Sequence, residues 1–349
     1  MLKELVLLRV VLLNLKPFSN FAKMNKKLLL LLLIGSCLFV SCKKEEASLP
    51  RIANGKINNI AIIVDDLLWN GEVGDSARNK FAAPVLGLPQ EEPLFNINQY
   101  PIKLMEGFMT DSRNVIVIKK GDVDHFSVKK DEYASPQNVF HITGKSVESI
   151  LTLIEKTAPQ IIRTIHQNEI EESQRLARKS LLEKEYFEKK FKISLQIPSS
   201  YELMLQDANF VWLKKEIISG NTSVLIYQVP LSAINNKKNI VANIIKMRDS
   251  IGNLYIHGKE PNTDMITEEA YAPYFFVVNL DNKLTYETRG TWELRDDFMS
   301  GPFINYAIID KENNRVLVLE GFCYSPSKEK RDLMLELEAI IRSVAVNKT

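Results

Sequence analysis

The sequence predicts an α+β protein: an N-terminal α/β lobe, a long connecting helix, and a C-terminal antiparallel sheet with a terminal helix. Three observations predict this class. Strand and helix patterns alternate from Ile57 to Ile142, a long helical pattern begins at Ser146, and apolar residues recur at every second position from Phe191 onward. Strands followed by a helix that packs across them are typical of α+β domains.

Composition allows two lobes with cores of their own. The 349 residues are 45% hydrophobic and 25% charged, which excludes disordered, collagen-like and disulfide-scaffold classes. The formal net charge is +2, but residues 1–42 contain six of the 45 Lys and Arg and one of the 43 Asp and Glu, leaving −3 for the remainder. Because a nucleic-acid-binding protein needs a basic surface that survives processing, we expect no nucleic-acid partner.

Residues 24–41 have the layout of a signal peptide. Lys26 and Lys27 precede an apolar run from Leu28 to Val40, which is shorter than the roughly 20 residues that span a bilayer as a helix. We therefore interpret residues 1–23 as an upstream extension and expect translation to start at Met24 rather than Met1. Deleting that extension should not change the mature protein.

Cys42 is the predicted site of lipidation. It ends the apolar run and is followed at once by KKEE at 43–46. A cysteine in this place accepts a diacylglyceryl group and becomes the first residue of a lipoprotein, and two or three acyl chains such as palmitate hold a protein durably on a membrane. Cys37 fits the commoner consensus but would leave a second apolar stretch in the mature chain; plain secretion with an incidental cysteine is the other alternative.

The N-terminal lobe is expected over residues 56–145, after an acylated tether at 42–55. Pro84, Gly87, Pro89 and Pro93 exclude regular structure from 86 to 97. The expected strands are 57–64, 114–118 and 139–142, and the expected helical segments are 77–83, capped by Asp75-Ser76, and 100–108.

A helical connector is expected over 146–190, capped by Ser146 and interrupted at Pro159. The alternative is that this segment packs back as part of one continuous domain. The C-terminal lobe follows at 191–349, and its alternating pattern predicts an antiparallel sheet with one face in water. Its expected strands are 191–197, 224–229, 274–280, 284–294, 303–310 and 315–324, and its expected helices are 239–251 and 326–346.

Six segments spread over the mature chain resemble an uncharacterised lipoprotein family of Bacteroidetes, known only as a domain of unknown function. They are DDLLWNGEVGD (65–75), GLPQEEPLFNINQ (87–99), YASPQNV (133–139), IPSSYELMLQDANFVWL (197–213), GTWELRDDFMSGPFINY (290–306) and LEGFCYSP (319–326). The resemblance implies no known activity. Lys44-Glu45-Glu46 resembles the lipoprotein export signal of that phylum, which would imply display on the outer face of the outer membrane. The C-terminal lobe is similar in outline to PsbP-like domains, a likeness of fold alone.

The stretch 65–99 is the first candidate binding site. Its acids and its tryptophan follow a strand's carboxyl end, where open α/β sheets tend to bind ligands. These candidates are Asp65, Asp66, Trp69, Glu72, Asp75, Glu91 and Glu92. Three interpretations remain open: a binding surface with Trp69 as a stacking platform, a hydrolase that uses two acids as general acid and base, or a structured loop whose acids cap helices and whose tryptophan is core.

A second candidate lies in the C-terminal lobe, where Arg289, Trp292 and Arg295 are expected on a polar groove beside Glu293, Asp296, Asp297 and Tyr306. A solvated sheet face would have the same sequence pattern. The four histidines lie far apart; Asp122, Asp124 and His125 come nearest to a ligand cluster, and we expect no metal, no cofactor and no catalytic residue. Cys323, the one thiol left after processing at Cys42, is expected to be a buried small hydrophobe.

Together these features predict a non-catalytic cell-envelope lipoprotein that binds a partner protein or an envelope or surface glycan. The alternative is a lipoprotein hydrolase that acts on envelope polymers through the carboxylates of 65–99. In either case the membrane contact is the N-terminal lipid anchor, and the protein is expected at the outer membrane, on its periplasmic or surface-exposed face.

Overall fold

The computed structural model describes residues 51–104, 107–234 and 239–347, within one compact unit, Pro50–Thr349. The protein is α+β, as the sequence predicts. The expected signal peptide, the expected lipidation site Cys42 and most of the expected tether lie outside the described residues. In the part of the chain that the structure describes, no helix has the length and apolar character needed to cross a bilayer.

The first half of this unit is built on a five-stranded sheet that is parallel except for its edge strand β5. Its strands, in spatial order, are β3 (Asn96–Tyr100), β2 (Asn59–Val64), β4 (Asn114–Lys120), β7 (Asn138–Gly144) and β5 (His125–Lys130). The central strands are nearly continuous β-branched runs because both faces of the sheet are buried. Strand β5 was not predicted from the sequence, because its mostly exposed side chains give no apolar pattern. A short parallel pair, β1 (Arg51–Ile52) and β6 (Ala134–Ser135), lies outside this sheet.

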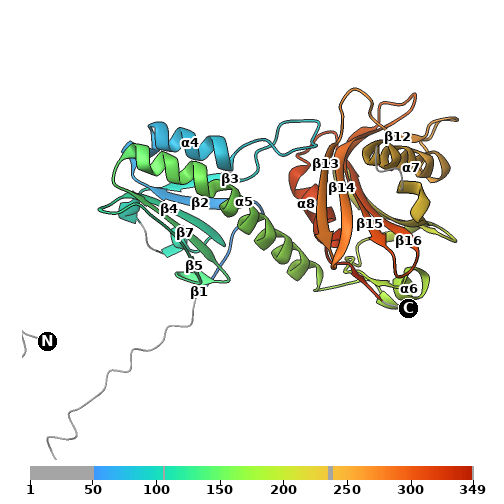
Figure 1. Cartoon of the computed structure of the whole chain (residues 1–349), viewed down its shortest axis with the longest axis horizontal. Coiled ribbons are helices and arrows are strands. Elements are labelled where there is room, and N and C mark those ends of the chain that lie inside the picture. The colour runs from blue at the N-terminus through green and yellow to red at the C-terminus, as the bar shows by residue number, and fades with distance from the viewer. Residues whose placement is uncertain (1–50, 105–106, 235–238, 348–349) are drawn as a thin grey trace, which may run out of the picture. The chain divides into compact units, whose positions relative to one another are not determined.

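Two helices cover one face of this sheet, α4 (Glu72–Phe81) and α5 (Val147–Ala177) (Figure 1). The expected start of α4 at residue 77 was wrong: α4 begins at Glu72, directly after the short helix α3 (Asp66–Trp69). Gly74 permits this close approach, because a Cβ at Gly74 would lie 1.8 Å from the carbonyl oxygen of Trp69.

The helix expected at 100–108 was also wrong. The described part of this segment ends β3 and then forms two short 3₁₀ turns, η2 (Ile102–Leu104) and η3 (Gly107–Thr110). Pro101 keeps Tyr100 in an extended conformation, and Gly107 has a φ of +61°, which breaks a right-handed helix.

Helix α5 begins where the sequence predicts, at a capping box in which Ser146 and Ser149 exchange hydrogen bonds. The expected interruption at Pro159 does not occur, because the buried side chains of Ile154, Ala158 and Ile161 hold both flanks of the proline on the core. Near its end, α5 contacts helix α8 through Ile170. A shorter helix, α6 (Lys184–Phe191), follows.

The second half is an eight-stranded antiparallel sheet. Its order is β12, β14, β15, β16, β11, β10, β9, and β13 pairs with β14 beside β12. The strands are β9 (Glu202–Asp207), β10 (Phe210–Ile217), β11 (Gly220–Pro230), β12 (Met265–Thr267), β13 (Tyr274–Leu280), β14 (Lys283–Leu294), β15 (Ser300–Asp310) and β16 (Arg315–Tyr324). The strand expected at 191–197 shrinks to β8 (Ile193–Ser194), paired with β17 (Ala345–Val346), and a 3₁₀ turn η4 (Leu231–Ile234) follows β11.

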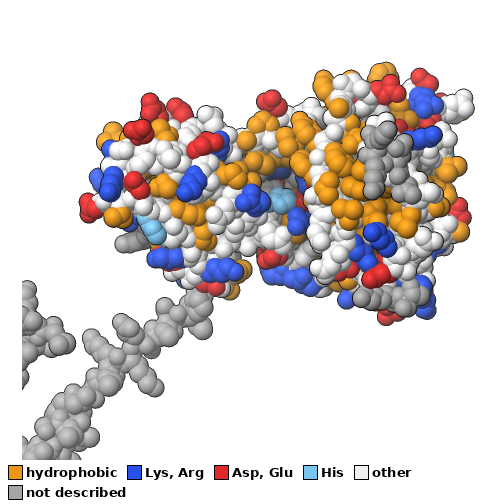
Figure 2. Space-filling view, viewed as in Figure 1, with side chains coloured by type: hydrophobic (Ala, Val, Ile, Leu, Met, Phe, Trp, Pro, Cys, Tyr) orange, Lys and Arg blue, Asp and Glu red, His pale blue; other side chains and the backbone are white. Residues whose placement is uncertain are grey.

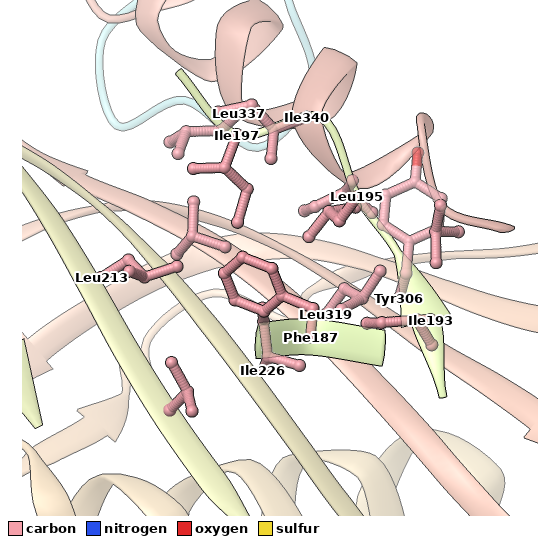
Figure 3. Packing of buried hydrophobic residues seen from close by; sticks show 14 of the residues in the cluster. Phe187, Ile193, Leu195, Ile197, Leu213, Ile226, Tyr306, Leu319, Leu337 and Ile340 are labelled. Atoms are coloured by element: carbon pink, nitrogen blue, oxygen red, sulfur yellow. The ribbon is translucent and has the colours of Figure 1, made fainter. Parts of the chain in front are cut away.

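The expectation of one water-exposed sheet face was wrong, because a helix packs on each face. Helix α8 (Arg331–Ile341) and the extended segment 193–197 bury one face (Figure 3), and α7 (Ile240–Tyr255) buries the other. Polar residues at alternate positions pair within the interior: Arg248 donates to Glu320 at 2.9 Å, and Asn305 donates to the same carboxylate. The polar residues at every second position of these strands therefore belong to an internal hydrogen-bond network and do not indicate a water-exposed face of the sheet.

Candidate functional site

The acids of the 65–99 stretch do not meet in one cleft. Asp65 and Asp66 line one surface depression with two lysines, whereas Glu72 and Asp75 line another beside α5. Glu91 is exposed on the following loop. The candidate carboxylates that follow the first strand therefore lie on separate surfaces of the protein.

Trp69 is half-buried and packs on the core beneath α4. The guanidinium carbon of Arg78 lies 4.5 Å from the centre of the indole ring, and Arg78 also forms a 2.7 Å ion pair with Asp75. One turn of α4 thus covers a ring face of Trp69 and neutralises one of the candidate acids. These contacts favour the structured-loop interpretation for both residues.

The second part of the stretch connects the two halves of the unit; we call residues 85–95 the docking segment. Glu92 is 5% exposed and accepts hydrogen bonds from the backbone N–H groups of Lys330 and Arg331, which open helix α8. Arg331 donates to the carbonyl of Pro93 at 2.8 Å, and Leu88 packs against the core under α8. Glu92 is therefore a helix cap supplied by a distant part of the chain.

The three candidates of the C-terminal lobe do not form one groove either. Trp292 is 2% exposed, and its indole N–H donates to the carbonyl of Cys323, so it is a core residue. Arg289 and Trp292 are three positions apart on β14 and so face opposite sides of the sheet. Arg295, past the end of β14, lies 3.6 Å from Asp264 and lines a depression beside α7.

Arg289 instead belongs to a larger site, which we call the arginine cavity. The cavity has a volume of about 920 Å³ and lies between the docking segment, α5, β13, β14 and α8. Its apolar lining residues are Val85, Leu86, Leu94, Phe95, Ile162, Phe275, Phe276, Val277, Val278, Met334 and Leu335, and its charged or basic ones are Arg163, His166, Glu287, Arg289, Arg331, Glu338 and Arg342. A volume of this size is typical of small-molecule sites.

A buried carboxylate organises the charged side of the arginine cavity. Glu338, 2% exposed, accepts hydrogen bonds or ion pairs from Arg289 at 2.9 Å and from His166, Arg342 and Tyr306, each at 3.3 Å. Burial by itself raises the pKa of Glu338, but Arg289, His166 and Arg342 more than offset burial, and the pKa lies well below its usual range. Glu338 is thus ionised at neutral pH and holds α8 to β14, β15 and α5.

The same pairs fix the arginines. Burial acts to lower the pKa of Arg289, but Glu338 and Glu287 raise it above its usual value, so the guanidinium stays charged. Four arginines and two glutamates line the cavity, which leaves a net positive charge even with His166 neutral. Arg163 is exposed on α5 and forms no ion pair with any residue that the structure describes.

Arg289 was a candidate from the sequence, but the rest of the cavity was not predicted. One available signal was the run YFFVVNL of β13, which shows no alternation of polar and apolar residues. A second was the set of charged positions on the apolar helix α8, Arg331, Glu338 and Arg342, which lie at helical spacing on or beside its buried face.

Other groups that the sequence singled out lie apart from this cavity. Cys323 is fully buried, and burial raises the pKa of its thiol to about 12, which confirms the expectation of an unreactive core cysteine. Asp124 accepts the backbone N–H of Lys145, and this hydrogen bond lowers its pKa. Within the described ranges, no three His, Cys, Asp or Glu side chains are grouped closely enough to hold a metal ion.

Fold and site together define an α+β protein with an apolar cavity bordered by arginines. Residues 180–343 match a family model described as "Domain of unknown function (DUF4837)". Residues 53–178 match a second model, also described as a domain of unknown function (DUF8532). The two halves of the described chain thus match two uncharacterised families, and no curated protein matches the chain.

Several solved structures are similar to part of the chain. The Ran-binding protein Mog1p of Saccharomyces cerevisiae is 9% identical and matches with a TM-score of 0.31 over 45% of this chain and 90% of its own. LpqN of Mycobacterium tuberculosis, a protein involved in cell envelope biogenesis, is 9% identical, with a TM-score of 0.28 over 44% of this chain and 83% of its own. Human StAR-related lipid transfer protein 5 is 7% identical, with a TM-score of 0.22 over 50% of this chain and 98% of its own. Similarity at this level says nothing about function.

Proposed function

We propose that the protein is a non-catalytic lipoprotein of the cell envelope, anchored through Cys42, that binds an envelope component in the arginine cavity. The cavity is the observation that carries the proposal. It combines an apolar wall with a fixed set of arginines, and a concave apolar surface with a few placed polar groups is the usual form of a ligand site.

The location rests on the leader of the sequence. A short apolar run that ends at Cys42 supports lipidation there, and the likeness of Lys44-Glu45-Glu46 to an export signal supports the outer membrane. Resemblance to a Bacteroidetes lipoprotein family points the same way. The anchor would keep the cavity within reach of membrane and cell-wall components.

The charge of the cavity favours an anionic component over a neutral glycan. A neutral sugar needs stacking platforms and neutral hydrogen-bonding groups, whereas Arg163 and Arg342 offer guanidinium groups to an anion. In the 65–99 stretch, Trp69 and Glu92 already make structural contacts. For these reasons the cavity, and not that stretch, is the proposed site.

Crosslinking and affinity purification of the acylated protein from intact cells test this proposal. Val277→Asp puts a charge on the exposed apolar wall; Val128→Asp does the same on the exposed edge strand β5 and serves as the control. We expect an associated molecule that Val277→Asp removes and Val128→Asp retains. The Cys42→Ala form should leave the membrane fraction, and a surface-protease assay reports which side of the outer membrane carries the protein. An association that is insensitive to Val277→Asp would refute the cavity as the site.

A further inference from the structure

The apolar wall of the arginine cavity leaves several large hydrophobic side chains exposed to solvent. Both faces of β13 contribute, because Phe275 through Val278 are consecutive and all line the cavity. Phe276 is 38% and Val277 61% exposed, and Leu86 of the docking segment is 48% exposed. Edge strands are normally protected by charged side chains, so an apolar edge that faces a cavity indicates a ligand that covers it.

The basic groups occupy the α5 and α8 side of the same cavity. Arg342 donates to Gln167 at 3.2 Å and His166 lies 3.3 Å from Glu338, so the two helices are bonded together at this point. Figure 2 shows hydrophobic side chains on both sides of a recess that contains basic side chains and a histidine. The cavity is therefore amphipathic, with most of its cationic groups on two helices and most of its apolar surface on β13 and the docking segment.

Not all arginines of the cavity have a carboxylate partner of their own within the protein. Arg289 is occupied by two carboxylates, Glu287 and Glu338. By contrast, Arg163 has no ion pair with a described residue, and Arg342 shares Glu338 with Arg289 and His166. An anionic head group at Arg163 and Arg342 would meet guanidinium groups that bind carboxylate or phosphate in a bidentate manner.

We infer that the arginine cavity binds a long-chain anionic amphiphile, with its carboxylate or phosphate at Arg163 and Arg342 and its acyl chain against β13. This inference rests on the proposed function and names its ligand. A small inorganic anion would leave the wall of β13 uncovered, and a neutral glycan would leave Arg163 without an ion pair. A fatty acid and an anionic phospholipid present the same chemistry, and only an amphiphile of this kind satisfies both sides of the cavity.

Photocrosslinking with a palmitate that carries a terminal diazirine tests the inference on the full-length protein in phosphatidylcholine nanodiscs. We expect adducts on the peptides that contain Leu86 and residues 275–278. Arg163→Gln should lower the yield about tenfold at subsaturating probe, the change that one charge-assisted contact is worth. Lys156→Gln, an exposed position on α5 outside the cavity, should leave the yield unchanged.

Competitors identify the head group and its source. Unlabelled palmitate or lysophosphatidylglycerol should reduce the adducts, and whichever acts at lower concentration identifies a fatty acid or a phospholipid as the ligand. Palmityl alcohol, which lacks the charge, should compete about tenfold less well. Equal competition by the alcohol, or adducts that spread over exposed apolar residues elsewhere such as Leu254 and Phe298, would overturn the inference.

The outcome also separates this inference from the proposed function. If a molecule associates in cells in a Val277-dependent way but palmitate and lysophosphatidylglycerol fail to displace it, the envelope-binding function stands and the amphiphile is wrong. A protein or acidic peptide captured in that way would have the same meaning. If no association depends on Val277 and no probe labels the cavity, both fail.

Discussion

Replacing Glu338 by glutamine should destabilise the protein strongly, and in a pH-dependent way. The carboxylate is 2% exposed and joins β14, β15, α5 and α8 through Arg289, Tyr306, His166 and Arg342. The amide side chain of the Glu338→Gln variant would keep the volume but not the charge. Arg289 would then retain one carboxylate, Glu287, in a largely buried place.

The magnitude follows from these contacts. A hydrogen bond to a charged partner contributes about 1.5–3 kcal/mol, and removing one partner of a buried ion pair costs about 3–5 kcal/mol in the free energy of unfolding. For Glu338→Gln at pH 7 we expect a cost of about 3–5 kcal/mol, because Glu338 is buried and its bond to Arg289 is less exposed to solvent than its contacts with Arg342 and His166.

The pH dependence has a definite sign. The pKa of Glu338 is lower in the folded protein than its ordinary value of 4.5, so its contribution to stability is complete above pH 4.5 and is lost as the pH falls toward the folded-state pKa. The difference between wild type and variant should therefore shrink by about 1.4 kcal/mol for each pH unit below 4.5.

Urea unfolding followed by circular dichroism at pH 7.0 and 3.5 provides the measurement. Glu336→Gln is the matched control. Glu336 lies on the same helix but is 31% exposed in a partly exposed pair with Lys215, and the amide can still accept the hydrogen bond from Tyr201, so its loss should cost less than about 1 kcal/mol. An effect of Glu338→Gln as small as that of the control, or one that grows in acid, would refute the reasoning.

Three further predictions concern the fold. Gly74→Ala should lower the free energy of unfolding by about 1–3 kcal/mol, because the new Cβ would collide with the carbonyl of Trp69, whereas Gly71→Ala meets ordinary contacts; thermal denaturation compares the two. In a chain in which Cys37 and Cys42 are replaced by serine, Cys323 should resist a thiol reagent at pH 8 and react only in urea; rapid labelling of the native protein would contradict its burial. Glu92→Gln should cost about 1–3 kcal/mol and speed proteolysis within the docking segment, because it weakens the cap of α8; an unchanged cleavage rate would show that Glu92 does not hold that segment.

Local patterns predicted the strands well where apolar residues are contiguous. The bounds of β13 and β16 agree with the expected ranges, and Ser146 caps α5 as its sequence indicates. These features depend on side chains that are neighbours in sequence, on strand alternation and on helix capping. The α+β class follows from them.

The errors share a cause, which is that tertiary contacts outweighed local preference. Pro159 does not interrupt α5 because the flanking apolar face is buried, and alternating polar residues such as Glu320 lie inside because Arg248 on α7 pairs with them. Gly74 moved the start of α4 through a contact with Trp69 that only the folded chain contains.

The site shows the same division. By itself the sequence determined the candidates at the first strand's carboxyl end, Arg289 on β14, and a leader that predicts lipidation at Cys42. Only the tertiary structure decided that Glu92 caps α8 and that Arg289 meets Glu338 and His166 in one cavity. The physical reason is that the periodicity of a sequence indicates only which face of a helix or strand a residue occupies. A cavity forms where the faces of elements distant in sequence meet, and the packing of the whole core determines where they meet.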